Sequence, residues 1–307
     1  MSEYKRKFSS EEKRAKLKTF NSVYYDGNPN IWKVSLLPNW MEFYGRSLDN
    51  ELNHRTPTFY RKFKPGTIVM VDYGVTIGSE MAGRHFAVVL SKNDTKYTKT
   101  VIVVPLSSKY HKNYVSLGKE LLKEAQSLGE KRVDEIQIQL NALQKRFQEF
   151  ISSKQNEANF ELSEDSVQFL RNNSYSNFDI FKHQITFNLK NGNKALENAI
   201  VEIKGIPSWE TYKDIFEFAS FMDTLISFQH SLLDDLQRLE KEVTELKKLV
   251  AEIERYNANT YANINGIRSI SKLRVSKFSK YSISGNISIS PATLDKLKTK
   301  LSKIIDI

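Results

Sequence analysis

The chain has 307 residues, of which 40% are hydrophobic, carries a net charge of +10 at pH 7 and contains no cysteine. This length allows two domains of ordinary size, and the absence of cysteine excludes disulfides, thiolate zinc sites and cysteine nucleophiles. No apolar run approaches the roughly 20 residues of a membrane helix, and the charged N-terminus has no signal-peptide pattern. We therefore expect a cytoplasmic protein that does not contact a membrane.

The positive charge lies at the two ends of the chain. Residues 1–118 carry a net charge of +9 and residues 261–307 a net charge of +7, whereas residues 119–260 carry −6. A basic excess confined to part of a chain favours a polyanionic partner, most simply nucleic acid. Charge that only maintains solubility is the alternative interpretation.

The first 63 residues predict a basic, aromatic-rich N-terminal extension. Residues 1–20 are typical of a loose basic helix or a tail, and residues 21–63 are expected to be irregular with one short helix between prolines. Their aromatic side chains would either stack on nucleic-acid bases or cover an edge of a sheet.

Three β-branched runs follow at residues 68–71, 85–91 and 101–108, and Pro65-Gly66 provides a turn before the first. Short runs of this kind with short polar links predict a small, curved antiparallel sheet or barrel.

Two long segments then have residues, all apolar except Gln229, at alternating spacings of three and four, which is the pattern of a coiled coil. The two sets are Val133, Ile136, Leu140, Leu143, Phe147 and Phe150, and Met222, Leu225, Gln229, Leu232, Leu236, Leu239, Val243, Leu246, Val250 and Ile253. The segments would pair as an antiparallel hairpin within the chain, or the longer one would pair with a second copy. Between them, Asn191-Gly192 predicts a β-hairpin over residues 183–205.

Strand-like alternation returns at residues 264–278, and Ser290 and Pro291 then mark the start of a C-terminal helix because they suit its N-cap and first position. The simplest organisation is one β-rich domain interrupted by an acidic helical insertion. Two independent domains are the alternative.

The link between the first two predicted strands, "GSEMAGRHFAVVL", brings several reactive side chains together. Glu80 is suited to orient or act as a base, Arg84 to bind phosphate, and His85 to transfer a proton near neutral pH. Ser107 and Ser108, after the third run, provide hydroxyl groups. Such a set could cleave RNA by removing the proton of a ribose 2′-hydroxyl and stabilising the crowded phosphate. A surface ion pair beside a structural histidine is the ordinary alternative.

The histidines have no metal-ligand spacing, so we expect neither a metal nor a cofactor. They are His54, His85, His111, His183 and His230.

Four segments, in the same order, resemble the MazF/PemK family of toxin ribonucleases. They are "KPGTIVMVDYGVTIGSEMAGRHFAVVLS" (64–91), "TVIVVPLSSK" (100–109), "YANINGIRSISKLRV" (261–275) and "ISPATLDKLKTKLSKII" (289–305). The resemblance implies an α+β fold with a small SH3-like β-barrel of the toxin type, here interrupted by the coiled-coil insertion. The expected parts are the extension 1–63, the barrel 64–118 plus 261–307, and the insertion 119–260.

The resemblance also implies roles for particular residues. The catalytic arginine of the family corresponds to His85, its catalytic threonine to Ser107 and its loop glutamate to Glu80, and we add Arg84 to this catalytic set. Arginine and histidine stand in exchanged order here, and Phe86 replaces the usual proline. The residues expected to bind RNA are Arg268, Lys272, Arg274, Ser108 and Lys109.

The resemblance implies that the protein is a metal-independent endoribonuclease toxin of a toxin–antitoxin system. It would be a homodimer that cuts single-stranded RNA to inhibit translation and is controlled by an antitoxin protein. The alternative is a non-catalytic module that binds RNA or protein on a coiled-coil stalk.

Overall fold

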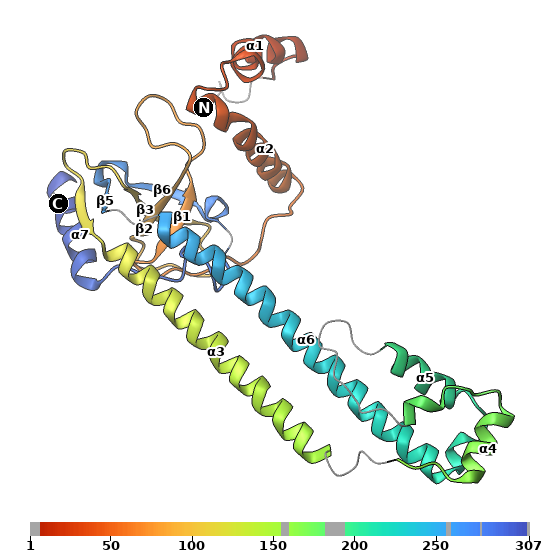
Figure 1. Ribbon diagram of the computed structural model, residues 1–307. Helices are drawn as coiled ribbons and strands as arrows, with labels where there is room; N and C mark the ends of the chain where they lie inside the picture. Colours follow the sequence, from red (N-terminus) through yellow and green to blue (C-terminus); the bar gives the residue numbers. More distant parts are fainter. Residues whose placement is uncertain (1–6, 155–159, 182–193, 256–258, 277, 306–307) are drawn as a thin grey trace. The chain divides into compact units, whose positions relative to one another are not determined.

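The computed structural model describes residues 7–154, 160–181, 194–255, 259–276 and 278–305. The chain has a mixed α+β fold and divides into two compact units (Figure 1). Unit 1 comprises Met1–Gly129 and Leu249–Ile307, and unit 2 comprises Glu130–Lys248. Two long helices, α3 (Glu120–Lys154) and α6 (Lys213–Arg255), each contribute residues to both units.

Unit 1 contains a six-stranded antiparallel sheet in the order β1-β2-β3-β5-β4, with β6 also paired to β3 (Figure 1). Its strands are β1 (Ile68–Asp72), β2 (Arg84–Val89), β3 (Thr100–Ser107), β4 (Val115–Gly118), β5 (Thr260–Ala262) and β6 (Arg268–Ser271). The three predicted strands are therefore present. Two strands that follow α6 complete the same sheet, so segments far apart in the sequence share one core.

Strand β3 is long enough to pair with three neighbours. Its residues 100–103 pair with β6, Leu106 and Ser107 pair with β5, and its middle pairs with β2, where Ala87 lies opposite Pro105. Because β2 and β5 lie on opposite sides of β3 in the strand order, β3 is the central strand of the sheet.

The sheet does not close, so the predicted barrel is wrong in this respect. The free edge of β1 is covered by the C-terminal segment, through isolated bridges from Thr67 to Ser288 and from Val71 to Val275. These bridges occupy the backbone groups that β4, at the other end of the strand order, would need to pair with β1.

One face of the sheet encloses an apolar core because side chains alternate along each strand. Its buried members are Phe63, Val69, Val71, Tyr73, Ala87, Val89, Val101, Val103 and Ile270. Helix α7 (Pro291–Ile305) belongs to the same unit, and its predicted N-cap is present, since Ser290 Oγ accepts a hydrogen bond from the Thr293 amide at 3.2 Å.

The N-terminal extension is mostly helical, which corrects the expectation of an irregular segment over 21–63. It forms α1 (Ser10–Asp26) and α2 (Trp32–Leu52). Helix α1 begins with a capping box between Ser9 and Glu12, and α2 continues through Pro38. The scattered aromatic residues concealed this helical periodicity.

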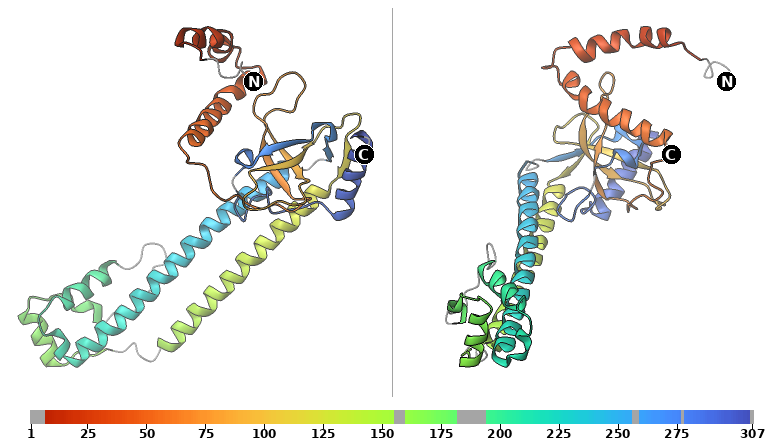
Figure 2. Two further views of the ribbon diagram at one scale, coloured as in Figure 1. Left: turned by 180° about the vertical axis from the view of Figure 1, so that it is seen from behind. Right: turned by 90° about the vertical axis from the view of Figure 1, so that its right-hand side faces the viewer.

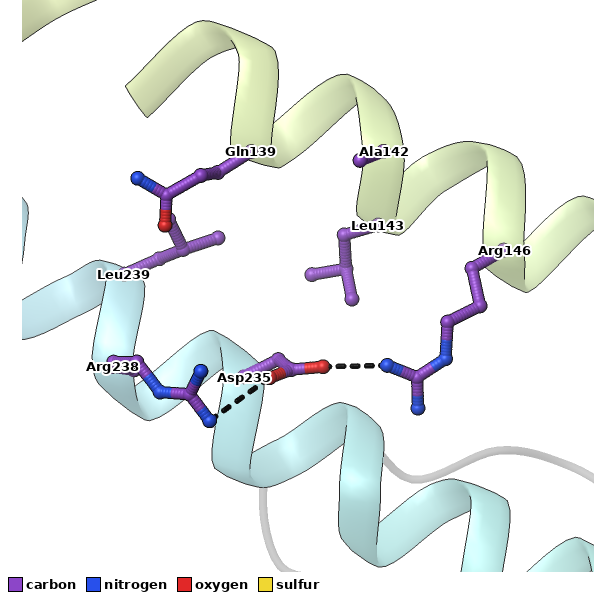
Figure 3. Close-up of a pocket in the computed structure, with 7 residues that line it drawn as sticks. All are labelled: Gln139, Ala142, Leu143, Arg146, Asp235, Arg238 and Leu239. Carbon is purple, nitrogen blue, oxygen red and sulfur yellow. Dashed lines mark hydrogen bonds and ion pairs between the residues drawn. The ribbon is translucent and has the colours of Figure 1, made fainter. Parts of the chain in front are cut away.

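In unit 2, helices α3 and α6 run antiparallel and side by side (Figure 2). Arg146 Nη1 on α3 donates to Asp235 Oδ2 on α6 at 2.6 Å, and Arg238 of α6 lies 3.1 Å from the same carboxylate (Figure 3). The two predicted coiled-coil segments therefore pair within the chain, as the first alternative proposed.

The residues of α3 that are shielded from solvent are not all those predicted from the apolar spacing. Ile136 is buried, but Val133 is 50% and Leu140 40% exposed. Arg132, Gln139 and Arg146 are half-buried, since long polar side chains can cover apolar surface with their stems and keep their heads hydrated. On α6, Leu249 is buried in place of the predicted Val250.

Unit 2 also contains a small helical cluster with its own core. It contains α4 (Glu164–Asn172), the 3₁₀ turns Phe178–Phe181 and Trp209–Thr211, and α5 (Lys194–Lys204). Of the hairpin expected over 183–205, residues 194–204 are helical, so that prediction is wrong there. Residues 183–193 lie outside the described residues.

Candidate active site

A pocket of about 280 Å³ lies where β2 begins and β3 ends. The residues that line it are Arg84, His85, Phe86, Leu106, Ser107, Ser108, Leu121, Arg255, Asn259 and Thr260. The strand pairing explains this meeting point. If the register of Ala87 opposite Pro105 is continued for two residues, His85 comes to lie opposite Ser107.

His85 is half-buried, and its Nε2 lies 3.1 Å from the carbonyl oxygen of Ala82. Burial lowers the pKa of the imidazole, and hydrogen bonding to the carbonyls of Ala82 and Leu106 opposes this shift only in part. A ring with a lowered pKa is neutral at neutral pH. His85 is therefore in the protonation state of a general base and brings no positive charge to the pocket. A neutral ring has a single N–H, so it donates to one of the two carbonyls at a time.

The end of β3 provides the hydroxyl groups of the pocket. Ser107 and Ser108 both line it, and Ser107 Oγ accepts a hydrogen bond from the Lys109 amide at 3.0 Å. This bond uses an oxygen lone pair and leaves the Ser107 proton available to a phosphate oxygen. Lys109, the next residue in the sequence after Ser108, is exposed.

Arg84 is the first residue of β2 and is exposed. Its Nη2 donates to Ser276 Oγ at 2.8 Å. Adjacent strand residues normally point to opposite faces, yet Arg84 and His85, the first two residues of β2, both line the pocket. Three of the four members of the predicted catalytic set, Arg84, His85 and Ser107, thus meet in one cavity together with Ser108.

Glu80 and Arg268 form a separate group. Glu80 Oε2 lies 3.8 Å from Arg268 Nη1, and the Arg268 guanidinium lies 5.2 Å from the centre of the Tyr73 ring. Neither of the two charged residues lines the pocket. The Glu80 carboxylate is placed to orient Arg268, and the structure gives it no direct position at the pocket.

Lys272 and Arg274 are committed to the protein interior. The Lys272 side chain is 3% exposed, and its Nζ donates to Asp94 Oδ1 at 2.7 Å and to the Arg61 carbonyl at 2.9 Å. Arg274 Nε donates to the Asp72 carbonyl at 2.8 Å, and burial lowers the pKa of its guanidinium. We therefore withdraw Lys272 as an RNA-binding residue, since its ammonium cannot reach a phosphate, and Arg274 is poorly placed for that role.

Six residues of the pocket were not among the predicted site residues. Two of them, Phe86 and Leu106, lie in β2 and β3, and the other four lie within the segment assigned to the insertion. These four are Leu121, at the start of α3, Arg255, at the end of α6, and Asn259 and Thr260, at the start of β5. A basic residue at the end of a predicted long helix was the only available signal, and it did not reveal that this helix ends at the pocket.

Helix α2 supports the loop that precedes the pocket. Lys33 Nζ donates to the carbonyls of Thr76 and Gly78 at 2.8 and 2.7 Å. Gly74, with a φ of +67°, lies so close to Trp40 that a Cβ atom there would be 2.5 Å from the indole ring. The N-terminal extension thus fixes the conformation of residues 74–83, which lead into Arg84 and His85.

Across the described ranges, no group of three or more histidine, aspartate or glutamate side chains is placed to hold a metal ion. Nor does any helix within these ranges combine the length and the hydropathy needed to cross a membrane.

A search of curated proteins finds no match to this chain. Residues 64–158, which contain β1 to β4, the pocket-lining ends of β2 and β3 and the whole of the described α3, match the model of one protein family. The family is described as PemK-like, MazF-like toxin of type II toxin–antitoxin systems. The chain therefore carries a PemK-like, MazF-like toxin domain at residues 64–158.

Proposed function

We propose that the protein is a metal-independent endoribonuclease that cleaves single-stranded RNA in the pocket between β2 and β3. The observation that carries this proposal is the meeting of Arg84, His85 and Ser107 in one cavity of the toxin-family segment. Proteins of this family are typically RNA interferases. Cleavage of RNA would inhibit translation, and the family match also supports an antitoxin partner. The homodimer stays a prediction from the resemblance.

The residues of the pocket match the needs of the reaction. The neutral His85 imidazole accepts the proton of a ribose 2′-hydroxyl, whose oxygen attacks the adjacent phosphorus to form a cyclic 2′,3′-phosphate. The Ser107 hydroxyl and the Arg84 guanidinium donate hydrogen bonds to the phosphoryl oxygens, where negative charge increases. The bond from phosphorus to the 5′-oxygen breaks, and that oxygen takes a proton from solvent or from the imidazolium just formed.

Local hydrogen bonding favours a second candidate function. The His85 ring bonds to backbone carbonyls, and Ser107 Oγ accepts the Lys109 amide. Both groups therefore have a structural role as well. A module that binds RNA or another protein without cleaving it would keep this arrangement.

The deciding experiment is to incubate the purified protein with a long single-stranded RNA in the presence of EDTA and to map the new ends. We expect cleavage, a loss of about 10²–10⁴-fold in rate for His85→Ala, and a smaller loss for Ser107→Ala. His230→Ala is the matched control because His230 lies in unit 2 and pairs with Glu197. RNA that is bound but left intact by the wild-type protein would favour the binding module.

A further inference from the structure

The pocket contains little fixed positive charge for a site that binds phosphate. His85 is neutral at neutral pH because burial lowers its pKa. Of the described residues that line the pocket, Arg84 and Arg255 alone carry a permanent charge. Within the pocket wall, these two guanidinium groups are therefore the fixed positive charges placed to contact a phosphodiester.

Arg84 is already engaged in the protein. Its Nη2 donates to Ser276 Oγ at 2.8 Å, and its charge acts on Glu252, one turn before the end of α6. Burial raises the pKa of the Glu252 carboxyl, while the backbone of Ile283 and the charges of Arg84 and Arg255 oppose that shift. Arg84, Glu252 and Arg255 thus form one charged group beside the pocket.

Arg255 is exposed at the last residue of α6, where the helix reaches the sheet (Figure 1). An arginine at a helix C-terminus also interacts favourably with the helix dipole, so its position alone does not indicate a ligand. Its place in the pocket wall does, since the same cavity is lined by His85, Ser107 and Ser108.

The remainder of the wall suits the rest of a nucleotide. Phe86, Leu106 and Leu121 are buried apolar residues, and Asn259 and Thr260 carry an amide and a hydroxyl group. The volume of about 280 Å³ is close to the lower end of small-molecule sites, so the pocket is suited to one nucleotide at a time.

We propose that Arg255 binds a phosphate of single-stranded RNA in this pocket, so that the end of the long helix α6 completes the substrate site begun by Arg84, His85 and Ser107. This inference rests on the proposed function. It assigns to the second half of the chain a substrate-binding residue that lies outside the family match at residues 64–158.

The test measures affinity separately from chemistry. A fluorescent, mixed-sequence single-stranded RNA with 2′-O-methyl groups cannot be cleaved through its 2′-oxygen, so anisotropy reports its binding alone. We expect Arg255→Gln to weaken binding about tenfold or more. The slope of log affinity against log salt concentration should fall by about 0.7, as expected for the loss of one phosphate contact on a single strand. Arg255→Lys should keep the slope and restore part of the affinity.

Arg238→Gln is the matched control, because Arg238 lies on the same helix within unit 2 and its side chain is 69% exposed. This variant should bind like the wild-type protein. If the wild-type protein binds RNA and Arg255→Gln binds it with the same affinity and salt slope, this inference is wrong, while the proposed function is unaffected. If Arg255→Gln fails to fold, as judged by circular dichroism, the test uses Arg255→Lys instead. Because lysine keeps the positive charge, a salt slope smaller than that of the wild-type protein in this variant would contradict a charge contact. A wild-type protein that binds no RNA would overturn the proposed function and this inference with it.

Discussion

His85 is half-buried, and this burial determines how the proposed cleavage should depend on pH. Desolvation lowers the pKa of its imidazole, below the value of about 6.5 for an exposed histidine. If His85 acts as the general base, only the neutral ring is active. The rate should therefore be constant near neutral pH and fall as the pH drops through the lowered pKa.

The measurement is the pH profile of kcat/KM, which reports groups of the free enzyme. The expected acid limb lies below pH 6.5 and is absent from the residual activity of His85→Ala. The free energy of unfolding should depend on pH with the same sign. A histidine whose pKa is depressed in the folded protein takes up its proton more readily in the unfolded chain. Its contribution to stability is present above pH 6.5 and is lost as the pH falls.

Lys272 shows why charge in the sequence did not identify the RNA-binding residues. A lysine in a basic segment has the same sequence signal whether its ammonium is exposed or buried. Here Asp94, 178 positions away in sequence, accepts its hydrogen bond. Arg268, Lys272 and Arg274 are close in sequence, but the fold directs only Arg268 toward the loop that carries Glu80.

The Lys272–Asp94 pair leads to a prediction about stability. Lys272→Met leaves a buried carboxylate without its cation, and the loss should be about 3–5 kcal/mol in the free energy of unfolding. Urea unfolding measures it. Lys298→Met is the control, because the Lys298–Asp295 pair is exposed and such pairs contribute about 1 kcal/mol or less. A similar small effect for both variants would contradict a structural role for Lys272.

At the scale of elements, the sequence predicted that the central strands and the long helices exist better than it predicted which of their residues are buried or what they pack against. The β-branched runs became β1, β2 and β3 because turns and strand propensity are local properties. The spacing of three and four located both long helices, but it did not predict that Leu249 would be buried rather than Val250. That choice depends on how the side chains of the two helices pack against each other, which the spacing within one segment does not contain.

The contact of α2 with the β1–β2 loop leads to a prediction for an element. Lys33→Met removes two hydrogen bonds to loop carbonyls, so the amides of residues 76–82 should exchange faster with deuterium. RNA cleavage should fall because Arg84 and His85 follow this loop directly. Lys18→Met on α1 is the control, since Lys18 is exposed. Unchanged loop exchange in Lys33→Met would show that α2 does not hold the loop.

At the scale of the whole molecule, the family match covers fewer of the strands than the sheet contains. The match ends at residue 158, whereas β5 and β6 join the same sheet as β1 to β4. The resemblance at 261–275 and 289–305 predicted that both flanks of the long helices belong to one fold. It could not predict that the ends of those helices would line the pocket, because the short motifs of the family contain no such helices.

We therefore propose that the dispensable part of the chain is residues 130–248, a narrower segment than the predicted insertion 119–260. A Cβ atom at Gly129 would lie 3.4 Å from Ile253 Cδ1, so α3 and α6 are adjacent at this level and a short Gly/Ser linker can join Gly129 to Leu249. The trimmed protein keeps Leu121 and Arg255, and it should therefore bind and cleave single-stranded RNA like the full chain.

The same deletion tests what unit 2 contributes. Its paired helices and separate apolar core favour protein–protein contacts, so trimming should change the oligomeric state or the inhibition by a partner, measured by light scattering and by cleavage assays with that partner. A control deletion of 119–260 removes Leu121 and Arg255 as well, and it should lose RNA affinity even where the sheet still folds. If the shorter deletion also folds but loses RNA affinity, unit 2 itself contacts the RNA and the proposed boundary is wrong.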